Sequence, residues 1–150
     1  MHAALLLIHL VSFAAYLGAG FAQLQFIKRS VNAVPAVRDA YEELSAAIVT
    51  KIELPAIMGS VITGIGFIVE NGALMKMGWL HGKLACVVGL LVLSHLEMFN
   101  ARNIVKLRKA NGAETDIEAR KKRHNLFGTI GTLLVVALLV LVTFVRLSAT

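Results

Sequence analysis

WLHGKLACVVGLLVL, residues 79–93, is the stretch that decides the fold of this chain. From Leu84 to Leu93 every residue is apolar or glycine, and the expected span extends to Phe99 through Ser94, His95 and Glu97. Such a segment is long enough, as a helix, to cross the hydrocarbon core of a bilayer, which is about 30 Å thick. A charge at this place is costly unless another group compensates it, so Lys83 is a candidate functional residue.

The composition indicates that lipid is the solvent for the whole chain. Of 150 residues, 57% are hydrophobic and only 16% are charged, and the mean hydropathy is +0.75. A soluble domain of this size would carry more apolar surface than its core can bury. We predict an all-α fold, in which residues 1–150 form one integral membrane four-helix bundle with four transmembrane helices. The predicted spans cover approximately residues 3–27, 54–69, 79–99 and 126–145.

The lysines and arginines predict the orientation of the bundle. Most of the 15 basic residues lie in two connections, between spans one and two and between spans three and four. The positive-inside rule makes both long connections cytoplasmic and both termini external, an N-out/C-out topology in the cell inner (cytoplasmic) membrane. The net charge of +6 is then a topology signal that requires no nucleic acid. The basic loops can also contact anionic membrane lipid.

Local signals predict how these connections are built. Pro35 is expected to open a helix whose acidic face, including Asp39 and Glu42, is solvated. Pro55 is expected to interrupt the hydrogen bonding of the second span. Asn111-Gly112 is typical of a turn, and Thr115 with Glu118 fits a capping box. Spans three and four should therefore extend beyond the bilayer as an antiparallel hairpin, and the helix that opens at Pro35 should project beyond it as well.

The polar residues of the spans fall into two layers, and each layer contains histidines. His9 and Lys83 lie at similar depth near the outer surface, with His81 in the same region. His95, His124 and Asn125 form an inner layer with the carboxylates Glu53 and Glu97. Neutral imidazole is the usual axial ligand of haem b, so His9 is a candidate iron ligand, with His95 or His81 as the second. A membrane histidine can instead be a hydrogen-bonded packing residue.

Lys83 has two interpretations. Near a helix end it can extend its ammonium group to the headgroups and serve only as an anchor. Alternatively it can bind a carboxylate or exchange protons, because a desolvated lysine titrates closer to neutral pH.

These residues resemble the HemJ-type membrane protoporphyrinogen oxidases and, more loosely, the CopD-like membrane domains. WLHGKL at 79–84 is similar to the Trp-Leu-His-x-Lys-Leu motif of that family, and His9 is similar to its first-span histidine. Pro55-Ala56 resembles its Pro-Ala, Ser94-His95 its Tyr-His, and Asn125 with Thr129 its last-span motif. The chain differs from the family at Tyr16 and Gln25, in place of Trp and Arg, and at Leu126 and Gly128, in place of Glu and Pro.

The resemblance implies a haem b protein that removes electrons from protoporphyrinogen IX and passes them to quinone or the respiratory chain. His9 would then be an axial ligand, and Lys83 the catalytic lysine that binds substrate, a propionate or the iron. His81, His95 and Asn125 complete the expected cofactor-binding set. A relative that keeps haem but lacks oxidase activity is also compatible with the differences.

Two other functions remain open from the sequence. The chain can be a non-catalytic membrane subunit or scaffold that docks a partner of a membrane complex through its basic cytoplasmic hairpin. It can also handle copper through His9, His81 and Met75. The two thioethers of Met75 and Met77 alone, without a His or Cys partner, would make a weak site. The sequence is also compatible with a homo-oligomer, because Gly78 and Gly82 can pack between protomers as easily as within one.

Overall fold

The computed structural model describes residues 2–145, and throughout that range its regular elements are helices. In chain order these are α1 (His2–Ser30), α2 (Pro35–Ile48), η1 (Val49–Glu53), α3 (Leu54–Glu70), η2 (Gly72–Lys76), α4 (Gly78–Lys109), α5 (Glu114–Val140) and η3 (Leu141–Val145). The all-α prediction is confirmed. Four continuous helices are long and apolar enough to cross a membrane: α1, the unit from α2 to α3, α4, and α5 with η3.

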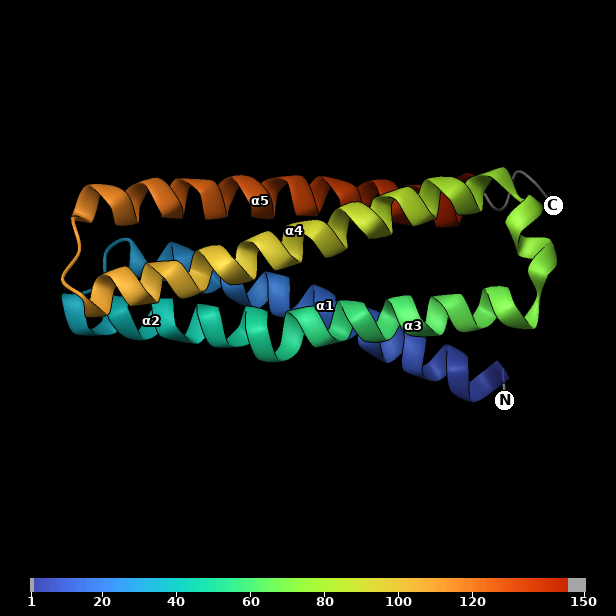
Figure 1. Cartoon of the computed structure of the whole chain (residues 1–150), viewed down its shortest axis with the longest axis horizontal. Helices are drawn as coiled ribbons and strands as arrows, with labels where there is room; N and C mark the ends of the chain where they lie inside the picture. The colour runs from blue at the N-terminus through green and yellow to red at the C-terminus, as the bar shows by residue number, and fades with distance from the viewer. Residues whose placement is uncertain (1, 146–150) are drawn as a thin grey trace.

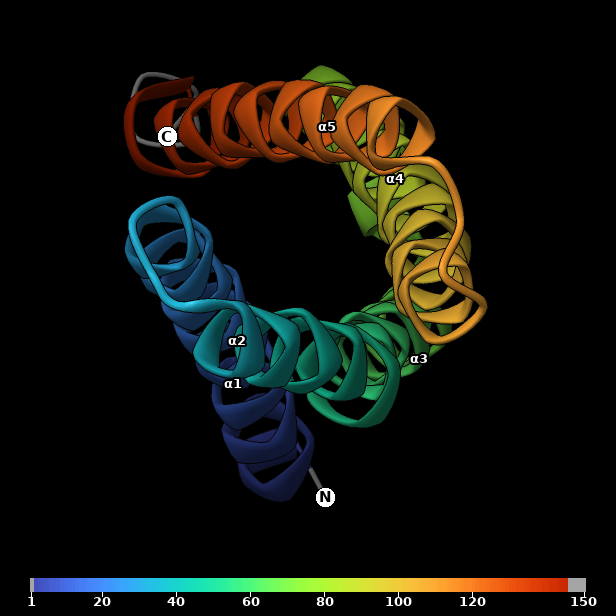
Figure 2. The ribbon, with the colours of Figure 1, turned by 90° about the vertical axis from the view of Figure 1, so that its left-hand side faces the viewer.

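The four long helices run side by side and form an arc when viewed along the bundle (Figures 1 and 2). α1 packs mainly on α2 and α3, α5 packs mainly on α4, and contacts of α2 and α3 with α4 join the two pairs. We call the end with connections 31–34 and 110–113 the basic end. The opposite end, with both chain termini and η2, is the terminal end. The N-terminal part of α1 diverges from α4 and α5 toward the terminal end.

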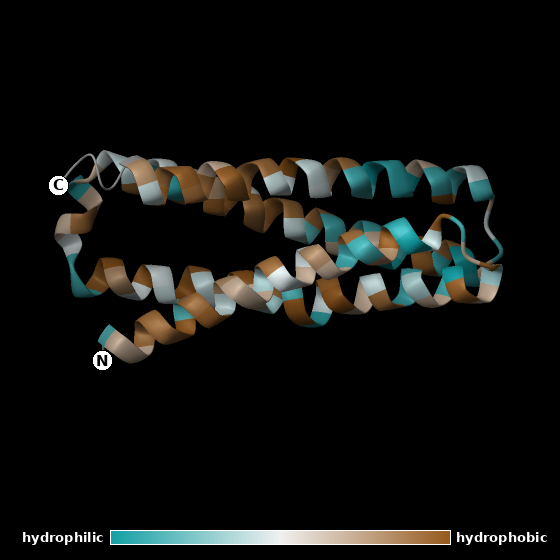
Figure 3. Ribbon diagram, turned by 180° about the vertical axis from the view of Figure 1, so that it is seen from behind, coloured by the Kyte–Doolittle hydropathy of each residue, from teal (hydrophilic) through white to brown (hydrophobic). Residues whose placement is uncertain are grey.

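The hydropathy of the surface changes along the bundle (Figure 3). Apolar residues dominate toward the terminal end, and polar residues gather on α2, α4 and α5 toward the basic end. Large apolar side chains on the outer faces remain exposed, for example Ile62 and Leu133, each 64% exposed. An exposed apolar belt of this extent is compatible with a multi-pass membrane protein, because soluble proteins rarely expose such large apolar areas to water.

The buried apolar core is small, and each long helix contributes to it. Tyr16, Ile57, Leu90 and Leu138 form the buried cluster, with one residue from α1, α3, α4 and α5. Glycines allow close packing around it: a Cβ atom on Gly59 would lie 2.8 Å from the Ser12 hydroxyl of α1. By contrast, a Cβ on Gly78 would meet nothing within 4 Å.

The two helix-interrupting signals are confirmed. Before Pro55 the chain forms the π-helical turn η1, in which the Leu54 N–H bonds to the Val49 carbonyl. The wider turn removes the clash that a proline ring makes with the preceding turn of an α-helix. After α4, Asn111 adopts a φ of 51° and the Gly112 N–H reaches the Leu107 carbonyl at 2.8 Å. This is a Schellman-type helix end.

Two local predictions were wrong. α5 begins at Glu114 after Ala113, with no side-chain cap, so Thr115 lies inside the helix and forms no capping box. Glu42 is buried rather than solvated, because Arg108 and Lys121 of the neighbouring helices bind its carboxylate. The predicted hairpin of α4 and α5 is present, joined by the short connection 110–113.

Candidate functional site

His9 lies between α1 and α3 in the half nearer the terminal end. Its Nδ1 atom is 2.9 Å from the Thr63 hydroxyl, and its ring meets the edge of Phe67 with centroids 5.7 Å apart. Gly64 lies against the same ring, since a Cβ there would be 3.7 Å from His9 Cε1. The imidazole is therefore held in one orientation by side chains of α3.

The hydrogen bonds of Thr63 determine which nitrogen of His9 carries the proton. The Thr63 hydroxyl donates to the Gly59 carbonyl at 2.8 Å, in the preceding helical turn. With its single proton used there, the hydroxyl oxygen accepts from His9 Nδ1–H. The lone pair of the neutral ring then lies on Nε2, the atom that can bind a metal.

Lys83 lies within electrostatic reach of His9 across the bundle. It is half-buried near the start of α4, one residue after Gly82, which packs on Leu141 of η3. The neighbouring His81 is exposed. The structure thus brings His9 and Lys83 into one region and leaves His81 on the outer surface.

The copper set from the sequence is not brought together. His9 faces α3, whereas His81 is exposed on α4 and Met75 is 43% exposed on η2. Across residues 2–145, no group of three or more His, Cys, Asp or Glu side chains is arranged to hold a metal ion. A single imidazole ligand to haem iron does not require such a group.

A second polar cluster lies deeper, centred on the buried Glu53 of η1. Gln23 of α1 donates to Glu53 Oε2, and the Ser94 hydroxyl of α4 donates to Oε1 at 2.9 Å. Tyr16 hydrogen-bonds to Ser94. The π turn before Pro55 supplies the backbone that presents Glu53 to both neighbouring helices.

Glu97 joins this cluster through a hydrogen bond to Glu53. The sequence indicated Glu53 and Glu97 but missed Gln23. Its amide within an apolar run was the signal that could have identified it.

His95 and Asn125 lie away from His9. His95 Nδ1 donates to the Leu91 carbonyl in its own helix at 2.8 Å, and its neighbour Ser94 belongs to the Glu53 cluster. Glu53, the partner of Ser94, marks the level of His95, and Thr63 marks the level of His9. These two residues are about 15 Å apart along the second long helix, at 1.5 Å per residue. Asn125 is exposed near the basic end. The structure does not bring His95 and His9 to one level.

Charges on the polar half of the bundle converge on Glu42. Arg108 and Lys121 both bind its carboxylate, from α4 and α5 respectively. Burial raises the pKa of Glu42, but the hydrogen bonds from Arg108 and Lys121 outweigh it and leave the pKa below 4.5. This cluster joins α2, α4 and α5, and its basic residues are therefore structural.

In comparisons with known proteins, no family model, curated protein or solved structure matches this chain.

Proposed function

We propose that this chain is a haem b-binding oxidoreductase of the cell inner membrane that resembles protoporphyrinogen IX oxidase. One observation carries the proposal: the His9 imidazole is held through Nδ1 by Thr63 and interacts electrostatically with Lys83. A fixed neutral imidazole and a lysine in an apolar region suit an iron porphyrin that carries carboxylates.

The residues around His9 fit a haem by their donor chemistry. His9 would hold the iron through Nε2, and the Thr63 hydroxyl would fix the ring and raise its basicity. Gly64 keeps the helix surface beside the ring free of a side chain. A bound haem b supplies one-electron acceptor chemistry.

Lys83 has the carboxylate-binding role in this proposal. Its ammonium group pairs with a propionate of haem or of protoporphyrinogen IX, because an apolar environment strengthens attraction between opposite charges. Lys83 also remains a candidate second ligand in its neutral form. Electrons removed from the porphyrinogen pass to quinone or the respiratory chain.

The membrane orientation belongs to the same proposal. The basic end faces the cytoplasm, by the positive-inside rule, and the terminal end with His9 and Lys83 lies near the outer surface. The polar overhang of the helices toward the basic end supports this assignment (Figure 3).

An absorption spectrum tests the haem. Protein expressed with an adequate haem supply and purified in detergent is expected to show a Soret band and, after reduction, α and β bands. His9→Ala should abolish the band, whereas His95→Ala, whose ring bonds within its own helix, should retain it. A folded wild-type protein without Soret absorbance would refute the haem proposal, and a band that survives His9→Ala would move the ligand elsewhere.

Complementation tests the catalytic step separately. The wild-type gene is expected to restore growth of a bacterial strain that lacks its porphyrinogen oxidase. Lys83→Met should fail while it retains some haem, and Lys83→Arg should restore growth partly, because it keeps a cation. If Lys83→Met supported full growth, Lys83 would have no catalytic role and would serve only to anchor the helix at the headgroups.

A non-catalytic membrane subunit is the second candidate function. Lys122 and Arg123 are exposed on α5, so they are accessible to an acidic partner or to headgroups. A folded chain that lacks a Soret band and still requires both charges for function in cells would favour this alternative.

A further inference from the structure

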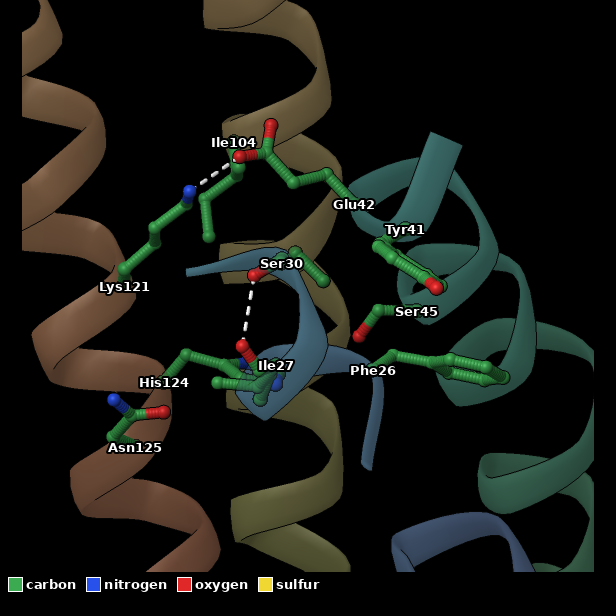
Figure 4. Close-up of a pocket in the computed structure, with 11 residues that line it drawn as sticks. Phe26, Ile27, Ser30, Tyr41, Glu42, Ser45, Ile104, Lys121, His124 and Asn125 are labelled. Carbon is green, nitrogen blue, oxygen red and sulfur yellow. Dashed lines mark hydrogen bonds and ion pairs between the residues drawn. The ribbon is translucent and has the colours of Figure 1, made fainter. Parts of the chain in front are cut away.

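A cavity lies inside the bundle near the basic end, away from His9 (Figure 4). It is partly open to the surroundings, and its empty space measures about 430 Å³ with that open part included. Residues of α1, α2, α4 and α5 line it. Its walls combine apolar groups, such as Ile27 and Ile104, with polar ones, such as Asn125 and Ser45. The cavity lies where the apolar part of the chain gives way to the polar part, since Ile27 and Asn125 each lie at the edge of a predicted span.

His124 is the unusual side chain of this cavity. It is only 6% exposed, and its Nδ1 atom has no hydrogen-bond partner. The side chain extends from α5 toward α1 into the cavity region (Figure 4). A buried nitrogen without a partner costs about 1–3 kcal/mol, so a ligand that completes the bond gains affinity.

The charges at the cavity are already neutralised. Glu42 and Lys121, the carboxylate and the ammonium group that line it, bind each other, and Arg108 adds a second cation to Glu42. Burial without an opposing charge keeps the His124 imidazole neutral. A neutral ligand with hydrogen-bonding atoms therefore fits this cavity better than an anion or a cation.

An aromatic wall favours a flat ligand. Phe26 and Tyr41 line the cavity and stack on each other, with ring centroids 5.8 Å apart and an interplanar angle of 25°. Flat rings pack well against such faces in an offset arrangement. His124 on the opposite helix can donate to a carbonyl or accept from a hydroxyl, depending on its tautomer.

We propose that this cavity binds the ring of a lipid-borne quinone or its quinol, with a ring oxygen on His124 Nδ1. Such a molecule is neutral, flat and concentrated in the membrane, and its two para oxygens suit an imidazole that can act as donor or acceptor. His9 and Ile27 are about 27 Å apart along α1, so the cavity is separate from the His9 region. The binding proposal stands without the haem; its use as an electron-acceptor site rests on the proposed function.

The binding experiment uses decylubiquinone, a short-tailed quinone, titrated into the purified full-length protein in detergent. Isothermal calorimetry is expected to show one saturable site. Ile104→Phe, which fills the cavity, should abolish binding, and His124→Leu should weaken it about tenfold. Lys122→Gln, exposed on the same helix, is the matched control and should bind like the wild type.

Nitrogen NMR of the ¹⁵N-histidine-labelled protein gives a direct readout that needs no variant. Decylubiquinone should shift the Nδ1 resonance of His124 and leave that of His95 unchanged. Equal binding by all three variants, no saturable site, or an unshifted His124 resonance would overturn the proposal. Displacement by dihexanoyl phosphatidate would also overturn it, because the cavity would then prefer an anionic headgroup. His9→Ala should still bind the quinone, so failure of one proposal leaves the other testable.

Discussion

Arg108 on α4 binds both carboxylate oxygens of Glu42 on α2, with Nη2–Oε1 at 3.0 Å and Nε–Oε2 at 3.1 Å. This two-point geometry is the strong form of an arginine–carboxylate pair. Lys121 of α5 binds the same carboxylate, so one side chain ties together three helices. The Glu42 side chain is 6% exposed, which protects the interaction from solvent screening.

Replacement of Glu42 by Gln is expected to lower the free energy of unfolding by about 3 kcal/mol, because Lys121 loses its carboxylate and Arg108 loses its two-point partner. Arg108 keeps its ion pairs with Glu114 and Asp39. Glu43→Gln is the matched control. Glu43 binds Lys109 in an exposed pair, so its loss should cost less than about 1 kcal/mol. Thermal unfolding in detergent measures both, and equal losses would contradict the buried-pair interpretation.

Acid should weaken the same cluster. Because Arg108 and Lys121 hold the pKa of Glu42 below its ordinary value, the unfolded state takes up a proton at a higher pH than the folded state does. The contribution of Glu42 to stability is therefore full above the unfolded-state pKa and disappears as the pH falls through the folded-state pKa. Unfolding measured from pH 7 to pH 3 should show this loss in the wild type and a smaller loss in Glu42→Gln. Identical profiles would refute the assignment.

Thr63→Val should weaken haem binding about 10- to 100-fold, because His9 loses the hydrogen bond that orients its ring. Thr63→Ser keeps the hydroxyl and should retain most of the affinity. Haem titration of the apoprotein, followed at the Soret band, measures the difference. If Val and Ser behave alike, the hydroxyl does not position the ligand.

The Glu53 and Glu97 pair predicts an asymmetry between two substitutions. Glu97→Gln keeps a donor for Glu53 and should change stability by less than about 1 kcal/mol. Glu97→Leu removes the donor and leaves Glu53 without one of its partners, at a cost of about 1–3 kcal/mol. Thermal unfolding compares the two variants, and a Leu variant as stable as Gln would show that the interaction between positions 53 and 97 contributes little.

The close packing of α1 on α3 can be tested by replacing a glycine at their contact with alanine. Gly59→Ala should destabilise the chain by about 1–3 kcal/mol, because its Cβ would approach the Ser12 hydroxyl to 2.8 Å. Gly18→Ala is the control, since a Cβ there would meet nothing within 4 Å and alanine favours the helix. A neutral Gly59→Ala would indicate that the Ser12 hydroxyl rotates away from the new Cβ, so that this contact does not limit how closely the two helices approach.

Much of the fold follows from local properties of the sequence. Apolar runs, prolines and a turn dipeptide predicted the four long helices, the interruption at Pro55 and the chain reversal at Asn111-Gly112. The capping box failed because Thr115 and Glu118 are common residues whose spacing also occurs inside helices. The inward position of Glu42 was missed because its partners come from other helices.

The sequence by itself determined the helices, their apolar lengths and the polar character of the basic end, because hydropathy and backbone propensity act over a few residues. Only the tertiary structure decided which polar side chains meet. The rotation of each helix about its axis and its choice of neighbour depend on packing over the whole bundle. Those choices bring Gln23 to Glu53, Thr63 to His9 and Arg108 to Glu42, and they leave His124 buried with an open nitrogen.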